Sequence, residues 1–225
     1  MAKKSKKKET EAIGLDVQLS KSEAFIEKNL KTILTVLAAV VIIVAGWFAY
    51  RHYMDGVESK AEEAIAKSQQ AFGQQQWEQA LNGNGAAEMG LLKIIDEYGS
   101  TKTGNLAKLY AALCYAKTGK TDEAIKWLEK YKDAGDAMVA PAAVAALANC
   151  YVQKGENQKG AEMLVKAAKE ADNDAISPIC LLQAGQVYEE LGQNDKALEL
   201  YQQVKDKYFR SPLANEMDKY IEKIK

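Results

Sequence analysis

The stretch that decides the fold is LYAALCYAKTGKTDEAIKWL, residues 109–128. On each side of Gly119 its apolar residues recur at the spacing of one helix face, and glycine is common in the turn after a helix. The stretch therefore predicts two helices joined by a tight turn. The same arrangement returns around Gly155 and Gly192, at intervals of 36 and 37 residues. Self-similarity at such a period indicates stacked helix pairs.

Aligned on these glycines, the three segments share a small residue, a tyrosine, a second small residue and a large apolar or aromatic residue. These positions hold Ala112, Tyr115, Ala124 and Leu128 in the first segment, Ala148, Tyr151, Gly160 and Leu164 in the second, and Gly185, Tyr188, Ala197 and Tyr201 in the third. The pattern resembles the tetratricopeptide repeat, in which small residues let paired helices approach closely. It predicts repeats near 105–138, 141–174 and 178–211, with Gly185 where two helices cross.

All three prolines of the chain stand where the first helix of a pair should begin, at Pro141, Pro178 and Pro212. Proline suits the first turn of a helix because its missing N–H is not needed there. Ser177 and Ser211 precede two of the prolines and are expected to cap those helices. The last proline predicts a capping helix over residues 212–225.

Upstream of the clear repeats, residues 57–98 are expected to form an atypical helix pair, with helices over 57–72 and 86–98. The Gln-, Asn- and Gly-rich stretch Gly73–Gly85 between them predicts an extended loop. Helix-forming residues are abundant and no alternating strand pattern occurs, so the whole chain is predicted to be all-α.

A run of 19 residues without a charge, TILTVLAAVVIIVAGWFAY, occupies positions 32–50. As a helix it would span about 28 Å, close to the thickness of a bilayer's hydrocarbon core. A buried core helix would carry a polar face, and a cleaved signal peptide would have a shorter apolar region. A permanent transmembrane helix is therefore the favoured interpretation.

The two sides of this span differ in charge. Residues 1–31 hold eight lysines and five acidic residues, whereas residues 51–225 carry a net charge of −4. Because basic flanks stay inside, we expect 1–31 to be a basic cytoplasmic tail and 51–225 to be exported. Ser20 and Glu23 have the spacing of a capping box, which predicts that a helix begins there. The acidic exported part gives no reason to expect nucleic acid as a partner.

The sequence lacks the residues that common catalytic and metal sites need. His52 is the only histidine and lies beside the predicted span, and Cys114, Cys150 and Cys180 do not have the spacing of metal ligands. We expect no enzyme activity, no metal, no cofactor and no small-molecule substrate. The cysteines are expected to be small packing residues, with a disulfide as the alternative.

Partner proteins are expected on the concave surface lined by the first helix of each repeat. The register places eight residues there: Leu109, Leu113 and Lys117 from the first repeat, Asn149 and Gln153 from the second, and Gln186, Glu189 and Glu190 from the third. This mixture predicts apolar contacts, amide hydrogen bonds and a basic partner residue near Glu189.

The order of basic tail, membrane helix and exported repeats resembles the ancillary SecYEG translocon subunit family. The resemblance rests on the span 32–50 and on LLKIIDEYGSTKTGNLAKLYAALCYAKTG at 91–119. It implies a protein of the bacterial inner membrane whose repeats lie in the periplasm as a docking platform at the exit side of the translocon. The partners it implies are translocon subunits, periplasmic chaperones or exported polypeptides. The alternative is a scaffold of the same fold in cell-wall or outer-membrane assembly.

Overall fold

The computed structural model describes residues 2–85 and 88–224, with side chains described at 25, 26, 28–85 and 88–224. Within these residues the chain is helical and contains no strand; an isolated bridge joins Gly83 and Met89. This confirms the all-α prediction. The chain divides into two compact units, Met1–Asp55 and Gly56–Lys225.

Helix α1, Ala2–Gly73, forms the first unit and contributes its last turns to the second. The prediction that a helix begins near Ser20 is wrong, because α1 is already helical from Ala2. Residues 2–31 contain no proline and many Lys, Glu and Ala residues, all of which favour a helix.

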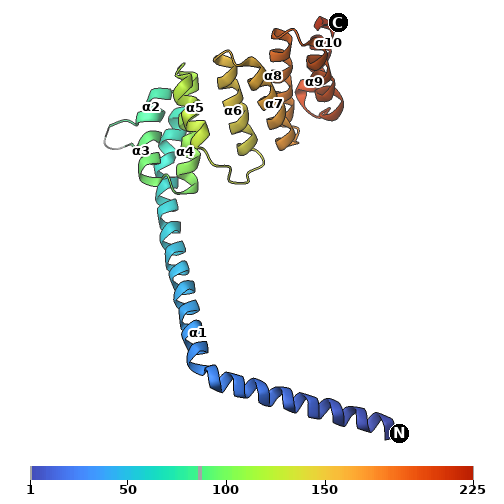
Figure 1. The fold of residues 1–225 in the computed structure, drawn as a ribbon. Coiled ribbons are helices and arrows are strands. Elements are labelled where there is room, and N and C mark those ends of the chain that lie inside the picture. The colour runs from blue at the N-terminus through green and yellow to red at the C-terminus, as the bar shows by residue number, and fades with distance from the viewer. Residues whose placement is uncertain (1, 86–87, 225) are drawn as a thin grey trace. The chain divides into compact units, whose positions relative to one another are not determined.

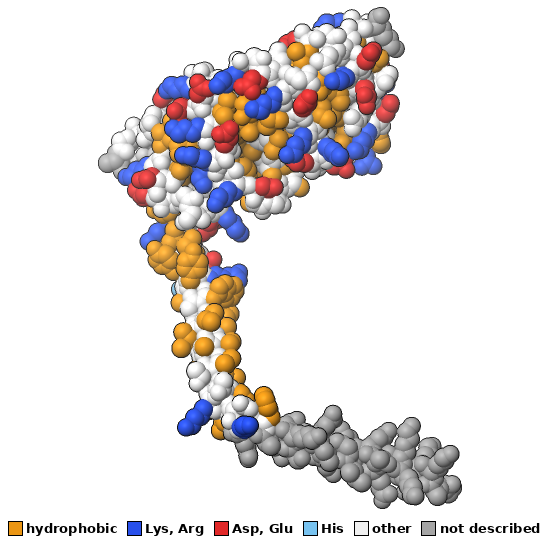
Figure 2. All heavy atoms as spheres, in the orientation of Figure 1, with side chains coloured by type: hydrophobic (Ala, Val, Ile, Leu, Met, Phe, Trp, Pro, Cys, Tyr) orange, Lys and Arg blue, Asp and Glu red, His pale blue; other side chains and the backbone are white. Residues whose placement is uncertain are grey.

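One segment of the described chain, Lys28–Gly73, is long and apolar enough to cross a membrane, with a mean hydropathy of 2.5 over its most apolar window. None of that window is buried. Exposed large apolar side chains from Phe25 to Tyr53 have 46–71% of their surface accessible, and Figure 2 shows them covering this part of α1. A helix of a soluble core would be largely covered, so the exposure fits a membrane anchor.

The second unit is a stack of helices (Figure 1). After the end of α1 follow α2 (Trp77–Asn82), α3 (Leu91–Tyr98), α4 (Lys102–Lys117), α5 (Thr121–Lys130), α6 (Val139–Gln153), α7 (Asn157–Ala171), α8 (Ser177–Glu190), α9 (Asn194–Lys207), the 3₁₀ helix η1 (Pro212–Glu216) and α10 (Met217–Ile224). The pairs α4–α5, α6–α7 and α8–α9 turn at Gly119, Gly155 and Gly192. Each glycine has a φ between +70° and +82°, which other residues rarely adopt.

Small residues bring the paired helices into close contact. Gly185 of α8 lies directly against the fully buried ring of Tyr201 in α9, so the predicted position of Gly185 at a helix crossing is confirmed. Gly160 of α7 similarly lies against Val152 and the carbonyl of Ala148 in α6. The second and third repeats thus pack as the small-residue pattern predicted.

The predicted loop over Gly73–Gly85 is partly wrong, because residues Trp77–Asn82 form helix α2. Ala80 and Leu81 are buried in the same core as Leu91 of α3, and this apolar packing stabilises the helix despite the polar composition. The chain leaves this core at Gly83 and returns to it at Gly90. A Cβ on Gly90 would overlap the backbone of Leu81 to Gly83, so the two ends of this excursion touch.

The two serines do not cap their helices as predicted. Ser177 is already inside α8, where its hydroxyl donates to the carbonyl oxygen of Ala168 at 2.7 Å and so ties α8 to α7. The turn before α8 is instead closed by Asn173, whose side-chain oxygen accepts from the N–H of Ile176 at 2.8 Å. Ser211 precedes η1 without a side-chain cap bond. The side-chain oxygen of Asn173 accepts a local backbone hydrogen bond as well as a serine hydroxyl does. The residue types alone therefore did not show whether Asn173 or Ser177 would close the turn before α8.

Candidate partner-binding groove

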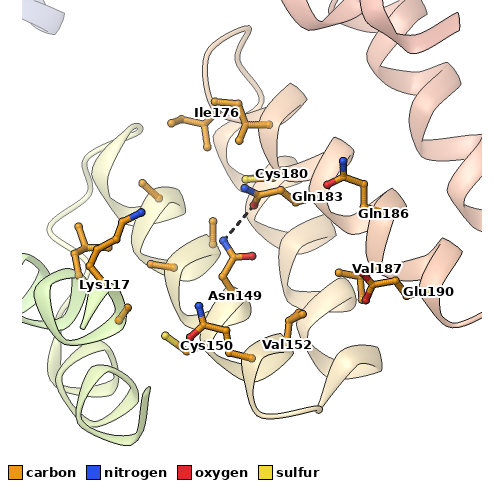
Figure 3. A pocket seen from close by; sticks show the side chains of 17 residues that line it. Lys117, Asn149, Cys150, Val152, Ile176, Cys180, Gln183, Gln186, Val187 and Glu190 are labelled. Atoms are coloured by element: carbon orange, nitrogen blue, oxygen red, sulfur yellow. Dashed lines mark hydrogen bonds between the residues drawn. The ribbon is translucent and has the colours of Figure 1, made fainter. Parts of the chain in front are cut away.

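A groove with a volume of about 540 Å³ runs along α4, α6 and α8, the first helices of the three repeats. In Figure 3, Asn149 of α6 and Gln183 of α8 face each other across it, with Ile176 toward one end and Lys117 on the α4 side. The groove therefore lies on the surface formed by the first helix of each repeat, as the register predicted.

The structure brings six of the eight predicted residues together in this groove. They are Leu113, Lys117, Asn149, Gln153, Gln186 and Glu190. Glu189 lies instead in an adjoining pocket of about 430 Å³, which it shares with Gln186, Glu190, Tyr220 and Lys223. Whether these residues bind a partner stays a prediction.

The assignment of Leu109 to the groove is wrong, because its side chain is 7% exposed and packs with Ala112 and Leu128 in the core. The reason is helical geometry. Steps of four residues overshoot one turn by about 40°, so the series Leu109, Leu113 and Lys117 rotates by about 80° around α4. Leu113 and Lys117 therefore line the groove, whereas Leu109 lies outside it.

Sequence reasoning missed the apolar floor of the groove. Ala142, Ala145 and Ala146 of α6 line it, and Ile176, which precedes α8, and Ile179 of α8 extend it. Ile179 is 45% exposed although it is a large apolar residue. Small floor residues would let a partner backbone approach closely, and the exposed Ile179 would be stabilised by being covered. The alanine-rich run at 140–148 was the available signal.

Two of the predicted amides are already hydrogen-bonded within the chain. The side chain of Asn149 donates to Gln183 at 3.2 Å, and the side-chain oxygen of Gln153 accepts from the Thr121 hydroxyl at 3.2 Å. Gln186 and Glu190 are exposed. Recognition by amides would therefore depend more on Gln186 than on the other two.

The carboxylate of Glu189 is already bound within the chain, whereas the sequence predicted that a basic residue of a partner would lie near it. Its side chain is only 12% exposed, accepts from the buried Tyr201 hydroxyl, and accepts from Lys223 of α10 at 2.7 Å. Partial burial opposes its ionisation, but the hydrogen bonds from Lys223 and Tyr201 outweigh burial and lower the pKa of Glu189. Among the described residues, neighbouring Glu190 makes no ion pair.

Cys150 and Cys180 line the groove wall but are buried, and all three cysteines are free thiols. Burial raises the pKa of Cys180 to about 11, and burial together with the charge of Glu78 raises the pKa of Cys114 to about 12. Such thiols stay protonated near neutral pH and are poor nucleophiles. Among the side chains that the structure describes, at 25, 26, 28–85 and 88–224, no group of His, Cys, Asp or Glu is arranged to hold a metal ion.

Comparison with known families agrees with this geometry. Residues 23–144, more than half of the chain, match the family model of the tetratricopeptide repeat-like domain, and residues 180–208 match that of a tetratricopeptide repeat. The chain therefore belongs to the tetratricopeptide repeat-like domain family. Domains of this kind typically bind other proteins and are not catalytic, so the repeats indicate a protein-interaction scaffold.

Among solved structures, the chain is similar to the crystal structure of MamA, with 20% sequence identity and a TM-score of 0.41 over 60% of this chain and 86% of that one. No curated protein matches the sequence.

Proposed function

We propose that this protein is a single-pass membrane-anchored scaffold that holds its repeat domain outside the cytoplasm and binds a segment of another protein in the groove. The groove along α4, α6 and α8 is the observation that carries the proposal. The exposed apolar surface of α1 supports the anchor, and the lysines at positions 3–31 support a cytoplasmic N-terminus.

The groove suits a peptide segment because it combines an apolar floor with polar groups at its sides. Its alanines and isoleucines would bury apolar side chains, while Lys117 and Glu190 lie on opposite helices, α4 and α8. A partner segment with an acidic residue toward α4 and a basic residue toward α8 would match these charges. The basic residue is expected at Glu190, since Glu189 is already bound to Lys223.

The partners we favour are translocon subunits, periplasmic chaperones or exported polypeptides, which the resemblance to the SecYEG ancillary family implies. A scaffold for cell-wall or outer-membrane assembly is the second candidate. Co-purification in mild detergent followed by mass spectrometry separates them, since each predicts a different set of envelope proteins.

Site-specific photo-crosslinking tests the groove itself. A photoreactive residue at Gln186 or Lys117 should crosslink to a partner, whereas one at the exposed Lys169 of α7 should not. A variant with Asn149, Gln153 and Gln186 all changed to Arg should lose the partner while keeping its helical circular dichroism. If this folded variant recovers the same partners in the same yield, the groove is not the binding surface.

A further inference from the structure

Three lysines form a basic cluster at the end of the repeat domain where α4 begins and α5 ends: Lys108, Lys130 and Lys132. Asn105 of α4 holds the cluster together, because its side-chain amide donates to the carbonyl oxygen of Lys132 at 2.7 Å and accepts from the N–H of Lys132 at 2.9 Å. Lys108 lies three residues after Asn105 and so shares its helix face. These two bonds fix the chain leaving α5 against α4.

The basic cluster forms no ion pair with the carboxylates that the structure describes. Among the described residues, none of its three ammonium groups has a carboxylate oxygen within 4.0 Å, although ten other lysines do. Lys108 donates only to the carbonyl oxygen of Gly99 at 3.3 Å, and Lys130 lies 4.8 Å from the centre of the Trp127 ring. Partial burial and then the charges of Lys132 and Lys130 lower the pKa of Lys108.

The acidic residues that follow the cluster are engaged with their own backbone. Asp133 accepts from the N–H of Gly135 at 2.7 Å, and Asp136 accepts from the N–H groups of Met138 and Val139 at 2.8 Å. These carboxylates shape the turn into α6 instead of pairing with the lysines. The fold thus holds three like charges together, an arrangement that a bound anion would stabilise.

A short stretch of chain joins the proposed membrane span to this end of the domain. The carboxylate of Glu58 accepts from the first N–H groups of α4, those of Lys102 and Thr103, each at 2.8 Å. Glu58 follows Tyr50 by eight residues, a length of chain that reaches at most about 29 Å when fully extended. Lys108 lies five residues beyond Thr103, about 7.5 Å further along α4.

We propose that the basic cluster binds the headgroups of anionic phospholipids in the membrane that anchors the chain. The proposal rests on the membrane anchorage proposed above. Lysines near a bilayer are attracted to its negative surface within a Debye length, and the neighbouring Trp127 has the amphipathic ring that favours the headgroup region. A headgroup phosphate would supply the negative charge that no described carboxylate supplies to the basic cluster.

Lysine labelling of the full chain in lipid nanodiscs tests the proposal. One set of discs contains phosphatidylcholine alone, and a second contains about one third phosphatidylglycerol, which is anionic. An amine-reactive reagent and mass spectrometry report each lysine. Labelling of Lys130 and Lys132 should fall about threefold in the anionic discs and recover in high salt, while Lys166 and Lys169 of α7 should label equally in both discs.

A pair of variants makes the test specific to the cluster, with Lys108 as the readout. Lys130→Gln with Lys132→Gln should abolish the protection of Lys108 by anionic discs. The control pair, Lys166→Gln with Lys169→Gln, removes the same charge elsewhere and should leave the protection intact. Equal protection of Lys108 in both variants would overturn the proposal.

Three further outcomes are decisive. Unchanged labelling at Lys130 and Lys132 in a chain retained by the discs would overturn the lipid site and leave the anchor standing. Protection by inorganic phosphate in neutral discs, at the level given by phosphatidylglycerol, would show a site for free anions and not for the bilayer. A chain that is not retained by any disc would overturn the anchorage and this proposal together.

Discussion

Replacing Gly185 by alanine places one methyl group inside the contact between α8 and α9. A Cβ there would lie 2.8 Å from Cζ and 3.0 Å from Cδ1 of Tyr201, and nearer still to Cε1. The ring must move by about 1 Å to regain ordinary contact distances. Tyr201 is fully buried and bonded to Glu189, which also binds Lys223. Moving the ring therefore disturbs the contact that joins α8, α9 and α10.

Two opposing effects set the size of the change. Overpacking a buried contact costs about 1–3 kcal/mol, while alanine in a helix interior is about 1 kcal/mol better than glycine. The expected net loss for Gly185→Ala is about 1 kcal/mol, which lowers the melting temperature of a domain of this size by about 2–4 °C. Leucine adds three more carbons to the same space, so Gly185→Leu should cost more than about 2 kcal/mol.

Thermal unfolding of the detergent-solubilised chain, followed by circular dichroism, measures this loss. Gly73→Ala is the matched control, because a Cβ at Gly73 meets no atom within 4 Å. Combining Gly185→Ala with Tyr201→Leu should recover part of the loss, since the smaller side chain leaves room for the methyl group. If Gly185→Ala melts like Gly73→Ala, or its effect is the same in the Tyr201→Leu background, the proposed steric contact does not exist.

Two further predictions concern Glu58 and the topology. Glu58→Ala should cost about 1 kcal/mol at neutral pH, as loss of a helix cap does. Partial burial opposes ionisation of Glu58, but the hydrogen bonds from Thr103 and Lys102 outweigh it and lower the pKa. The native chain should therefore exceed Glu58→Ala in the free energy of unfolding by the full amount above the ordinary carboxyl pKa of 4.5. This difference, measured by urea titration, should shrink as the pH falls through the lower pKa of the folded state. A difference that does not change with pH would contradict the cap. A reporter fused after Lys225 that works only outside the cytoplasm should be active, whereas activity of a cytoplasm-only reporter would reverse the orientation.

The repeat architecture could be predicted because its determinants are local and periodic. The turn glycines, the small residues at helix crossings and the tyrosines recur at one spacing, so three segments support the same register. Six of the eight residues that this register assigned to the groove line the cavity along α4, α6 and α8, and their binding to a partner stays a prediction. It failed at Leu109, since steps of four residues drift around a helix and a repeat pattern does not show where a groove ends.

What the sequence could not predict depends on contacts between distant segments. Glu58 binds the start of α4 from 44 and 45 residues away, and no local motif indicates that bond. Helix α2 forms in a polar, glycine-rich stretch because Ala80 and Leu81 complete a core with α3 and α4. Lys223 binds Glu189 from 34 residues away, which changes the role expected of that carboxylate. In each case a contact with a distant segment of the chain, and not the residue type, determines the structural role of the residue.

The capping helix α10 also changes the charge beside the groove in which we propose that a partner binds. In many repeat arrays a final helix only covers the last apolar surface. Here Met217 and Ile221 of α10 do so, but Lys223 also reaches back to neutralise Glu189 on α8, a groove helix. Glu190 then remains as the carboxylate exposed to a partner, next to the amide of Gln186. The repeats alone would leave two adjacent acids at this end. Because Lys223 pairs with Glu189 in the adjoining pocket, a partner bound in the groove as proposed would meet one exposed carboxylate, that of Glu190, instead of two.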